Sequence, residues 1–382
     1  MTVSRTSLFF YSFSFVAIAA VCTGYLYVPG TVNAGNAPLG ATITTVATGL
    51  HNPRGLNFAP DGSLYVAEAG GNGTASQTQC GVMGDGSTRC YATTGSVTRI
   101  DLGTSEATRV LTNLPSLIAA NGIGNGATGV HDISFQGLGN SYVSMGLGGN
   151  TTLRESYFGA DGQNFSRLGR FNPSGRFRLN ENLGDYEAAN NPDGFVPDSN
   201  PYGVLALPGR VVIADAGGND LIQVSARGVI STLAVFPPVP RPTPGPPFVQ
   251  AVPTSVALGP DGEFYVGVLT GGPFTIGLAN VYRVPAGGGT PVVAYTGFTN
   301  IIDIAFGPDG SLYVLEIARN AIPNFGAGGR LVRISPDGTR TDVVVGPPLI
   351  APGGIAVGSD GALYVTNRST SSTLGEVLRI EP

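Results

Sequence analysis

The sequence predicts an all-β protein, a six-bladed β-propeller with four antiparallel strands in each blade. Three observations predict this fold: the composition, a phrase that recurs along the chain, and the strand patterns at its two ends. The 382 residues include 58 Gly and 29 Pro, while 42% are hydrophobic and only 12% are charged. Such a chain has enough apolar residues for a large core. Its many Gly and Pro residues indicate short strands joined by tight turns.

The recurring phrase consists of two short apolar runs joined by a turn, as in GLNFAPDGSLYVAEAG and DIAFGPDGSLYVLEIA. Four clear copies and two looser ones lie at residues 55–70, 132–146, 203–218, 255–271, 303–318 and 354–367. Asp261, Asp309 and Asp360 are 48 and 51 residues apart. A period of about 50 residues is typical of propellers and solenoids.

Each phrase predicts two strands, and each is followed by further strand patterns. Asp-Gly between two apolar runs indicates a hairpin, because Gly accepts positive φ. A third run follows every copy, as GSVTRIDL, RLGRFN, DLIQVSA, ANVYRVPA, GRLVRISP and GEVLRIEP. A fourth run follows all but the last copy, as EATRVLTNL, GRFRLNE, GVISTLAVF, TPVVAYTGF and TRTDVVVGP. Four antiparallel strands form one propeller blade.

The two ends of the repeat region complement each other. The last unit stops after its third strand, whereas ATITTVATGL at residues 41–50 precedes the first unit and has the pattern of a fourth strand. We therefore expect this N-terminal strand to complete the last blade and to close a ring over residues 41–382, which removes an open sheet edge. The alternative is a set of hairpins in two stacked sheets, which six in-phase copies disfavour.

The first 34 residues have the pattern of a secretory signal peptide. Arg5 precedes an apolar run at residues 8–21, and a small-residue site ends at Ala34. This pattern predicts cleavage after Ala34, a mature chain without a membrane span, and a secreted, periplasmic or extracellular location. The alternatives are an uncleaved anchor and a lipid on Cys22.

Two cysteines, Cys80 and Cys90, remain after the predicted cleavage and flank the Gly-rich loop QCGVMGDGSTRC. In an oxidising compartment such a pair is expected to form a disulfide. Two free thiols would require a reducing compartment.

The charge census excludes several classes of function. All 20 basic residues are Arg, so chemistry that needs Lys, such as a Schiff base or a P-loop, is excluded. The net charge is −5 and there is no basic run, so nucleic acid is not an expected partner. His51 and His131 are the only histidines, which excludes a three-His zinc site. The chain also contains no nucleophile elbow and no H-E-x-x-H motif.

Propeller topology predicts which side chains meet at the central channel, because first strands begin and second strands end on the same face. The residues expected there as ligand-binding candidates are Arg54, His51, His131, Asp132, Tyr202 and Asp303. The second strands end at Glu68, Asp215, Glu316 and Asn367, whose hard oxygen ligands suit Ca²⁺. The alternative for this second set is a solvated polar channel mouth, and the sequence establishes no cofactor.

The sequence resembles the ScyD/ScyE family of secreted propeller proteins. The resemblance lies in TTVATGLHNPRGLNFAPDGSLYVAEAGGNG (residues 44–73), GSVTRIDL, GVHDISF, NPYGVLALPGRVVIADAGGNDLIQV (residues 200–224) and the late PDG-x-x-Y-V units. It covers nearly everything after the predicted signal peptide. It implies a six-bladed propeller outside the cytoplasm, and the name-giving members are linked to scytonemin, an indolic-phenolic pigment. The family defines no catalytic residue set that could be transferred to this chain.

The expected function is therefore that of an exported binding or scaffold module with its site at the channel mouth, taking a small molecule or an extracellular protein as partner. Whether the chain is an enzyme is left open. The alternative is a Ca²⁺-dependent hydrolase of lactonase type that uses the channel-face carboxylates, with His131 or Asp132 as base. A quinone-dependent oxidoreductase is a third and weaker hypothesis, because neither its ligand set nor that of the calcium lactonases is complete in this sequence.

Overall fold

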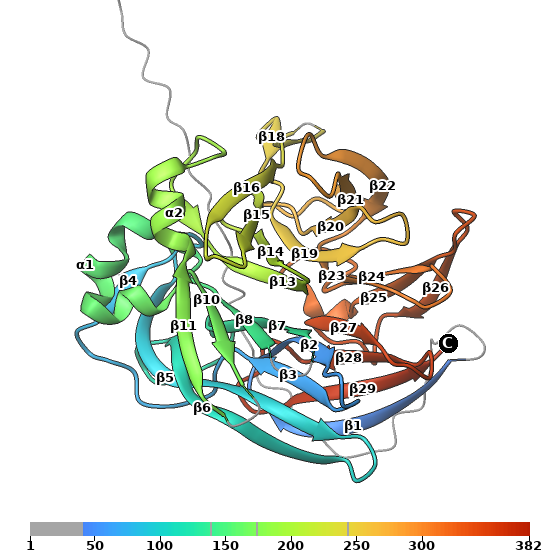
Figure 1. Ribbon diagram of the computed structural model, residues 1–382, viewed down its shortest axis with the longest axis horizontal. Coiled ribbons are helices and arrows are strands. Elements are labelled where there is room, and N and C mark those ends of the chain that lie inside the picture. The colour runs from blue at the N-terminus through green and yellow to red at the C-terminus, as the bar shows by residue number, and fades with distance from the viewer. Residues whose placement is uncertain (1–40, 138–139, 173–174, 243) are drawn as a thin grey trace, which may run out of the picture.

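The computed structural model describes residues 41–137, 140–172, 175–242 and 244–382. Six antiparallel sheets stand in a ring around a central channel, which confirms the predicted six-bladed propeller (Figure 1). The first strand of each blade contacts the first strand of the next, so these six strands line the channel. The predicted signal peptide at residues 1–34 lies outside the described residues. Within those residues, no helix is both long enough and apolar enough to span a bilayer.

In blades 1 to 5 the strands run outward from the channel in chain order, whereas in blade 6 the N-terminal strand β1 (Thr42–Leu50) is outermost. Blade 1 contains β2 (Pro53–Phe58), β3 (Leu64–Glu68), β5 (Thr88–Asp101) and β6 (Glu106–Ile118). Blade 2 contains β7 (Val130–Gln136), β8 (Asn140–Met145), β10 (Arg167–Phe171) and β11 (Phe177–Asn182). Blade 3 contains β13 (Pro201–Leu207), β14 (Arg210–Asp215), β15 (Asp220–Ser225) and β16 (Ile230–Val235).

The second half of the ring repeats this order. Blade 4 contains β19 (Pro253–Leu258), β20 (Phe264–Val268), β21 (Ala279–Val284) and β22 (Val292–Phe298). Blade 5 contains β23 (Ile301–Phe306), β24 (Leu312–Glu316), β25 (Arg330–Ile334) and β26 (Arg340–Val345). Blade 6 contains β27 (Gly354–Val357), β28 (Leu363–Asn367), β29 (Gly375–Glu381) and β1 (Thr42–Leu50).

The N-terminal strand closes the ring as the sequence predicts. β1 pairs antiparallel with β29, from Thr42 opposite Glu381 to Leu50 opposite Gly375. Leu50 and Ala47 are buried in the same apolar cluster as residues of blades 1 and 6. Strand β1 therefore joins the two ends of the repeat region and shields the outer edge of β29.

Two structural features account for the recurring phrase, one within the hairpin turn and one between neighbouring blades. In the turn of blade 1, Gly62 has φ +82°, and Asp61 Oδ1 accepts the N–H of Ser63 at 2.9 Å. In three of the four well-formed copies, the tyrosine after the turn packs against a phenylalanine in the first strand of the next blade. These ring pairs are Tyr65–Phe135 and Tyr265–Phe306, both with centroids 5.0 Å apart, and Tyr364–Phe58 at 5.2 Å across the closure. The phrase thus encodes both the turn and the blade-to-blade contact.

Two insertions form a lateral rim beside blades 1 and 2. β4 (Cys80–Val82) extends the sheet of blade 1, and helix α1 (Arg154–Phe158) lies between β8 and β10 in the chain. Gln79 Nε2 donates to Phe158 O at 2.7 Å, so the two insertions are in direct contact. Figure 1 shows α1 and β4 together at the outer edge of the ring.

The predicted disulfide is present. Cys80 and Cys90 are bonded, and they are directly opposite each other in the β4–β5 ladder, with Cα atoms 4.0 Å apart. It ties the rim to the end of β5 that extends beyond the blade.

Replacing both cysteines by serine should lower the free energy of unfolding by about 2–3 kcal/mol, because a loop of this length is no longer closed in the unfolded chain. Urea unfolding of the wild-type and doubly substituted chains measures the difference. Equal midpoints with equal slopes would contradict this expectation.

The proline-rich segment at residues 236–248 predicts an extended surface connection. In the structure, β17 (Val239–Pro240) pairs with β18 (Phe248–Val249), so the two ends of the segment form a short hairpin. Val239 and Val249 are buried together with Phe236 in the core shared by blades 3 and 4. Burial of these three side chains explains why the segment folds back on its own blades.

Candidate functional site

Five of the sequence-predicted ligand residues are brought together at the channel. Arg54, His131 and Tyr202 are second in β2, β7 and β13, whereas Asp132 and Asp303 are third in β7 and β23. They lie close enough to act on one another electrostatically: Arg54 acts on His131 and Tyr202, and Asp303 acts on Asp132 and Tyr202. The topology therefore assembles this group from four blades, and its ligand role stays a prediction.

Arg54 and Tyr202 carry polar atoms that no described residue satisfies. Their side chains are buried, with 4% and 9% of their surfaces exposed. Arg54 Nη2 donates to Ala127 O at 2.9 Å, but Arg54 Nε and Tyr202 Oη have no hydrogen-bond partner among the described residues. The guanidinium lies near the phenol without forming a hydrogen bond of ordinary geometry. An unsatisfied buried polar atom is costly, so this pair is suited to a ligand that supplies acceptors.

A second buried arginine, Arg89, lies beside Arg54, although it was not among the ligand-binding candidates that the sequence predicts. Arg89 is 3% exposed, and its Nη1 donates to Asn125 O at 3.3 Å. Burial lowers the pKa of Arg89, Asp85 partly opposes this, and the neighbouring charge of Arg54 lowers it further. Two close guanidinium groups make this side of the channel mouth electropositive.

His131 is held in a fixed position and is uncharged at neutral pH. Its Nδ1 lies 3.2 Å from Pro201 O, and its ring packs against that of Tyr202 at a tilt of 33°, with centroids 4.5 Å apart. Burial, and then the charge of Arg54, lower the pKa of His131 to about 3. The imidazole therefore supports the position of Tyr202 and presents a neutral aromatic surface.

Asp132 and Asp303 connect adjacent blades. Asp132 accepts the N–H of Val204 in blade 3, and Asp303 accepts that of Ile355 in blade 6, both at 2.8 Å. Each also accepts the N–H of the following residue in its own strand, at 2.8 Å. Burial raises the pKa of Asp303 to about 7. Burial, and then the charge of Asp303, raise the pKa of Asp132 well above its usual value.

This burial predicts a pH dependence of stability. Between its unfolded pKa of 3.8 and its folded pKa of about 7, Asp303 holds a proton in the folded state that the unfolded chain releases. Stability therefore falls as the pH rises through this window. We expect the melting temperature in EDTA to decrease by about 2–4 °C from pH 5 to pH 8. Asp303→Asn should reduce this slope without abolishing it, because burial also raises the pKa of Glu316 to about 7 and that of Glu187 to about 8. The exposed control Asp61→Asn should keep the full slope. A slope unchanged in Asp303→Asn would contradict the assignment.

His51 and Glu68 belong to a separate group in blade 1. Glu68 Oε2 accepts the N–H of His51 at 2.6 Å and Nη2 of Arg109 at 3.0 Å. Its Oε1 accepts the hydroxyls of Ser96 and Thr98. Burial, followed by the charge of Arg109, lowers the pKa of His51, and Glu68 opposes this. Both oxygens of Glu68 are thus engaged within its own blade.

The other three metal candidates make a similar local connection. Asp215, Glu316 and Asn367 each accept a backbone N–H from the segment that precedes the first strand of the same blade. The donors are Asn200 at 2.6 Å, Thr299 at 2.9 Å and Ile350 at 2.7 Å. Across the described residues, no three His, Cys, Asp or Glu side chains form a group that could hold a metal. The equivalent positions of these side chains are therefore explained by hydrogen bonds that fix each strand end.

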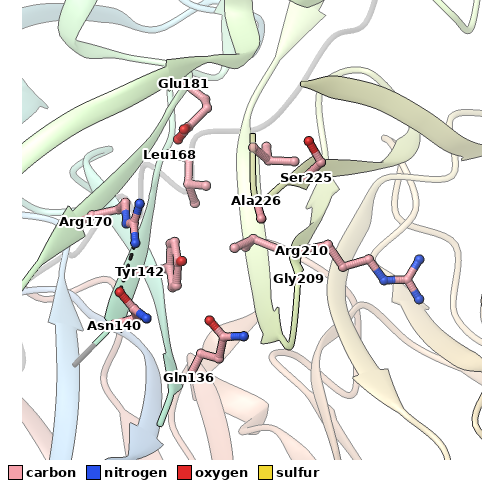
Figure 2. Close-up of a pocket in the computed structure, with 12 residues that line it drawn as sticks. Gln136, Asn140, Tyr142, Leu168, Arg170, Glu181, Gly209, Arg210, Ser225 and Ala226 are labelled. Atoms are coloured by element: carbon pink, nitrogen blue, oxygen red, sulfur yellow. Dashed lines mark hydrogen bonds between the residues drawn. The ribbon is translucent and has the colours of Figure 1, made fainter. Parts of the chain in front are cut away.

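A cavity of about 190 Å³ lies between blades 2 and 3, toward the face that carries the Asp-Gly turns. Figure 2 shows Tyr142, Arg170 and Asn140 on one wall and Gly209 and Ala226 on the other. Arg170 Nη2 donates to Asn140 Oδ1 at 2.9 Å, so its charge is already engaged. The polar groups of this cavity do not converge on one point, and it lies away from the channel-mouth group.

Comparisons with known proteins indicate the fold alone. No family model and no curated protein matches the chain. A pyrroloquinoline quinone-bound aldose sugar dehydrogenase from Streptomyces coelicolor is 13% identical over 91% of this chain and 100% of its own, with a TM-score of 0.52. A luciferin-regenerating enzyme is 12% identical over 90% and 96% of the two chains, with a TM-score of 0.51. A putative gluconolactonase is 14% identical over 90% and 93%, with a TM-score of 0.50.

Proposed function

We propose that this chain is an exported ScyD/ScyE-type propeller that binds a small anionic molecule at the channel mouth without transforming it. The observation that carries the proposal is the buried pair of unsatisfied donors, Arg54 Nε and Tyr202 Oη, beside a second guanidinium from Arg89. The resemblance of residues 44–73 and 200–224 to that family supports the assignment, as does the disulfide, which suits an oxidising compartment.

Each residue of the proposed site has a distinct role. Arg54 supplies the charge and a directed N–H, Tyr202 supplies an O–H, and Arg89 adds to the positive potential. The packed His131 and Tyr202 rings offer an aromatic wall, which favours a flat carboxylate or phenolate. Because burial raises the pKa of both groups, to about 7 for Asp303, Asp132 and Asp303 oppose a bound anion less than two ordinary carboxylates would.

The hydrolase alternative gains less support. Its proposed ligands Glu68, Asp215, Glu316 and Asn367 lie in four different blades and make hydrogen bonds within them. Its proposed bases are a neutral His131 bonded to Pro201 and an Asp132 bonded to the next blade. Close sequence similarity to a lactonase would favour the hydrolase, but the putative gluconolactonase of similar fold is only 14% identical to this chain.

The proposal is tested by calorimetric titration with a panel of aromatic carboxylates, including benzoate, 4-hydroxybenzoate and indole-3-acetate. Tyr202→Phe removes only the unpaired hydroxyl, so its melting temperature should stay within about 1 °C while affinity falls about 5–20-fold. Arg54→Gln removes the charge, and affinity should fall about 30-fold or more. The control Arg283→Gln alters an exposed pair with Asp261 and should bind as the wild type does.

Two outcomes would contradict the proposal. One is that no aromatic anion in the panel binds the wild-type protein at millimolar concentration. The other is that Tyr202→Phe and Arg54→Gln bind as tightly as the wild type. Turnover of a lactone added in the same buffer would instead favour the hydrolase, if that turnover were lost in Glu68→Gln and Glu316→Gln.

A further inference from the structure

Five carboxylates gather beside blade 3, away from the channel-mouth group. Glu187 lies on helix α2 (Leu183–Asn190), Asp193 and Asp198 follow in the chain, and Asp215 and Asp220 occupy the facing ends of β14 and β15. Four of them are almost completely buried, with exposures of 3% for Glu187, 2% for Asp198, 2% for Asp215 and 1% for Asp220. Figure 1 places α2 near the outer strands of blade 3.

Asp220 lies close to two other carboxylates, Asp215 in the neighbouring strand and Glu187 on helix α2. Asp215 and Asp220 are directly opposite each other in the β14–β15 ladder, where like charges are unfavourable. Gly218 lies in the turn between them. A methyl group on Gly218 would lie 3.2 Å from Asp220 Oδ1 and also 3.2 Å from Glu187 Oε2. The carboxylates of Glu187 and Asp220 therefore face each other across Gly218.

Glu187 and Asp220 differ from Asp193 and Asp215 in having unsatisfied oxygens. Asp215 accepts four hydrogen bonds from the turn and from residues 199 and 200. Asp193 Oδ2 accepts Nδ2 of Asn219 at 2.8 Å. By contrast, both oxygens of Asp220 and Oε1 of Glu187 are buried without a hydrogen-bond partner among the described residues.

No positive charge in the described part of the chain compensates Glu187 or Asp220, since neither forms an ion pair there. The hydroxyl of Thr232 lies near Asp220 and favours its charged form, but it carries no positive charge. An uncompensated buried carboxylate is strongly unfavourable. Two such carboxylates near one point are stabilised either by bound protons or by a shared positive partner.

We propose that Glu187 and Asp220 bind a divalent cation of the calcium class. Carboxylate oxygens are hard ligands, and Ca²⁺ completes its shell with backbone carbonyls and water. In this site the protein supplies two carboxylates, those of Glu187 and Asp220. A third acidic, His or Cys ligand is lacking among the described residues, where no such group of three forms. Such a site has a dissociation constant of about 10⁻⁴–10⁻³ M, as in extracellular modules. The ion connects helix α2 to blade 3, whose Asp215 holds the segment that leads to Tyr202.

The test is thermal unfolding of EDTA-stripped protein in 0–10 mM CaCl₂ at pH 7.5. The melting temperature of the wild type should rise by about 2 °C or more at the highest concentration. Asp220→Asn and Glu187→Gln should not respond to CaCl₂, and in EDTA they should unfold at or above the wild-type temperature. The matched control Glu316→Gln changes a buried carboxylate of blade 5 and should keep the full response.

Terbium luminescence gives a second readout that does not depend on stability. The chain has no Trp, so tyrosine sensitises bound Tb³⁺, and Tyr186 is adjacent to Glu187. Emission should saturate in the wild type, decrease on addition of CaCl₂, and be weak in Asp220→Asn.

Three results would overturn the proposal. The first is that neither CaCl₂ nor Tb³⁺ produces a change in the wild type. The second is a thermal response that persists in both Asp220→Asn and Glu187→Gln. The third is a response lost in Glu316→Gln but kept in Asp220→Asn, which would place the ion at the strand-end carboxylates. The channel-mouth titration with aromatic anions is unaffected by any of them.

Discussion

A chain that begins at Pro53 should not form a stable propeller. It lacks β1, so β29 loses its outer partner along the whole ladder from Thr42 to Leu50. It also loses the buried side chains of Ala47 and Leu50 from the core between blades 6 and 1. We expect a loss of about 5 kcal/mol or more, which is most of the stability of a typical domain. Circular dichroism during heating and size-exclusion chromatography measure this loss.

Two control chains make this prediction specific. A chain that begins at Gly35 keeps β1 and should unfold at the wild-type temperature. In a permuted chain, residues 41–52 follow Pro382 through a short Gly-containing linker. Because Thr42 is opposite Glu381, this linker forms a hairpin, and most of the lost stability should return. A truncated chain as stable as the wild type would contradict closure of the ring by β1.

Replacing Asp215 by Ala should strongly destabilise the protein, because this carboxylate fixes the end of β14. Asp215 Oδ1 accepts the N–H groups of Asn200 at 2.6 Å, Gly217 at 2.9 Å and Gly218 at 3.2 Å, and Oδ2 accepts Ser199 Oγ at 2.6 Å. The substitution leaves these buried donors unsatisfied, so we expect a loss of about 3–5 kcal/mol. Relief of the repulsion with Asp220 reduces this loss by a smaller amount.

Urea unfolding in EDTA measures the effect of Asp215→Ala independently of any metal ion. Glu316→Gln is the comparison, because Glu316 accepts one backbone N–H, at 2.9 Å, and Gln can still accept it. It should cost about 1 kcal/mol. Asp215→Ala could instead be as stable as the wild type in EDTA and less stable than the wild type only in Ca²⁺. Asp215 would then be a metal ligand and not a hydrogen-bond acceptor that fixes the strand end.

The blade count and the closure of the ring were predictable because both follow from local rules. Asp-Gly turns such as Asp61-Gly62 determine where hairpins form, and alternating apolar residues determine which faces pack. The missing fourth strand of the last unit could be matched only by residues 41–50. The hairpin within residues 236–248 was not predictable, because composition alone does not show which apolar side chains find a partner.

The candidate site was predictable in part. Arg54, His131 and Tyr202 meet because equivalent positions of first strands converge in any closed ring. Arg89 was not selected as a ligand-binding candidate, because it comes from an insertion that has no counterpart in the other blades. Asp220 was missed because its importance depends on Glu187, which is far from it in sequence and is brought near it by helix α2.

The same equivalence of positions explains why the metal candidates were selected together. Glu68 and Asp215 recur at strand ends, and a sequence cannot distinguish a repeated metal ligand from a repeated hydrogen-bond acceptor. In the structure, each accepts an N–H from the start of its own blade. This local role is sufficient to account for their recurrence.

The channel mouth is proposed to bind an anion between Arg54 and Tyr202. Crystals soaked in sodium bromide test this proposal most directly, because anomalous scattering locates bromide without knowledge of the natural ligand. We predict an anomalous peak within about 3.5 Å of both Arg54 Nε and Tyr202 Oη, the range of a hydrogen-bonded anion. The peak should be absent in Arg54→Gln crystals. Ordered bromide elsewhere on the protein, with none between these two atoms, would contradict the account.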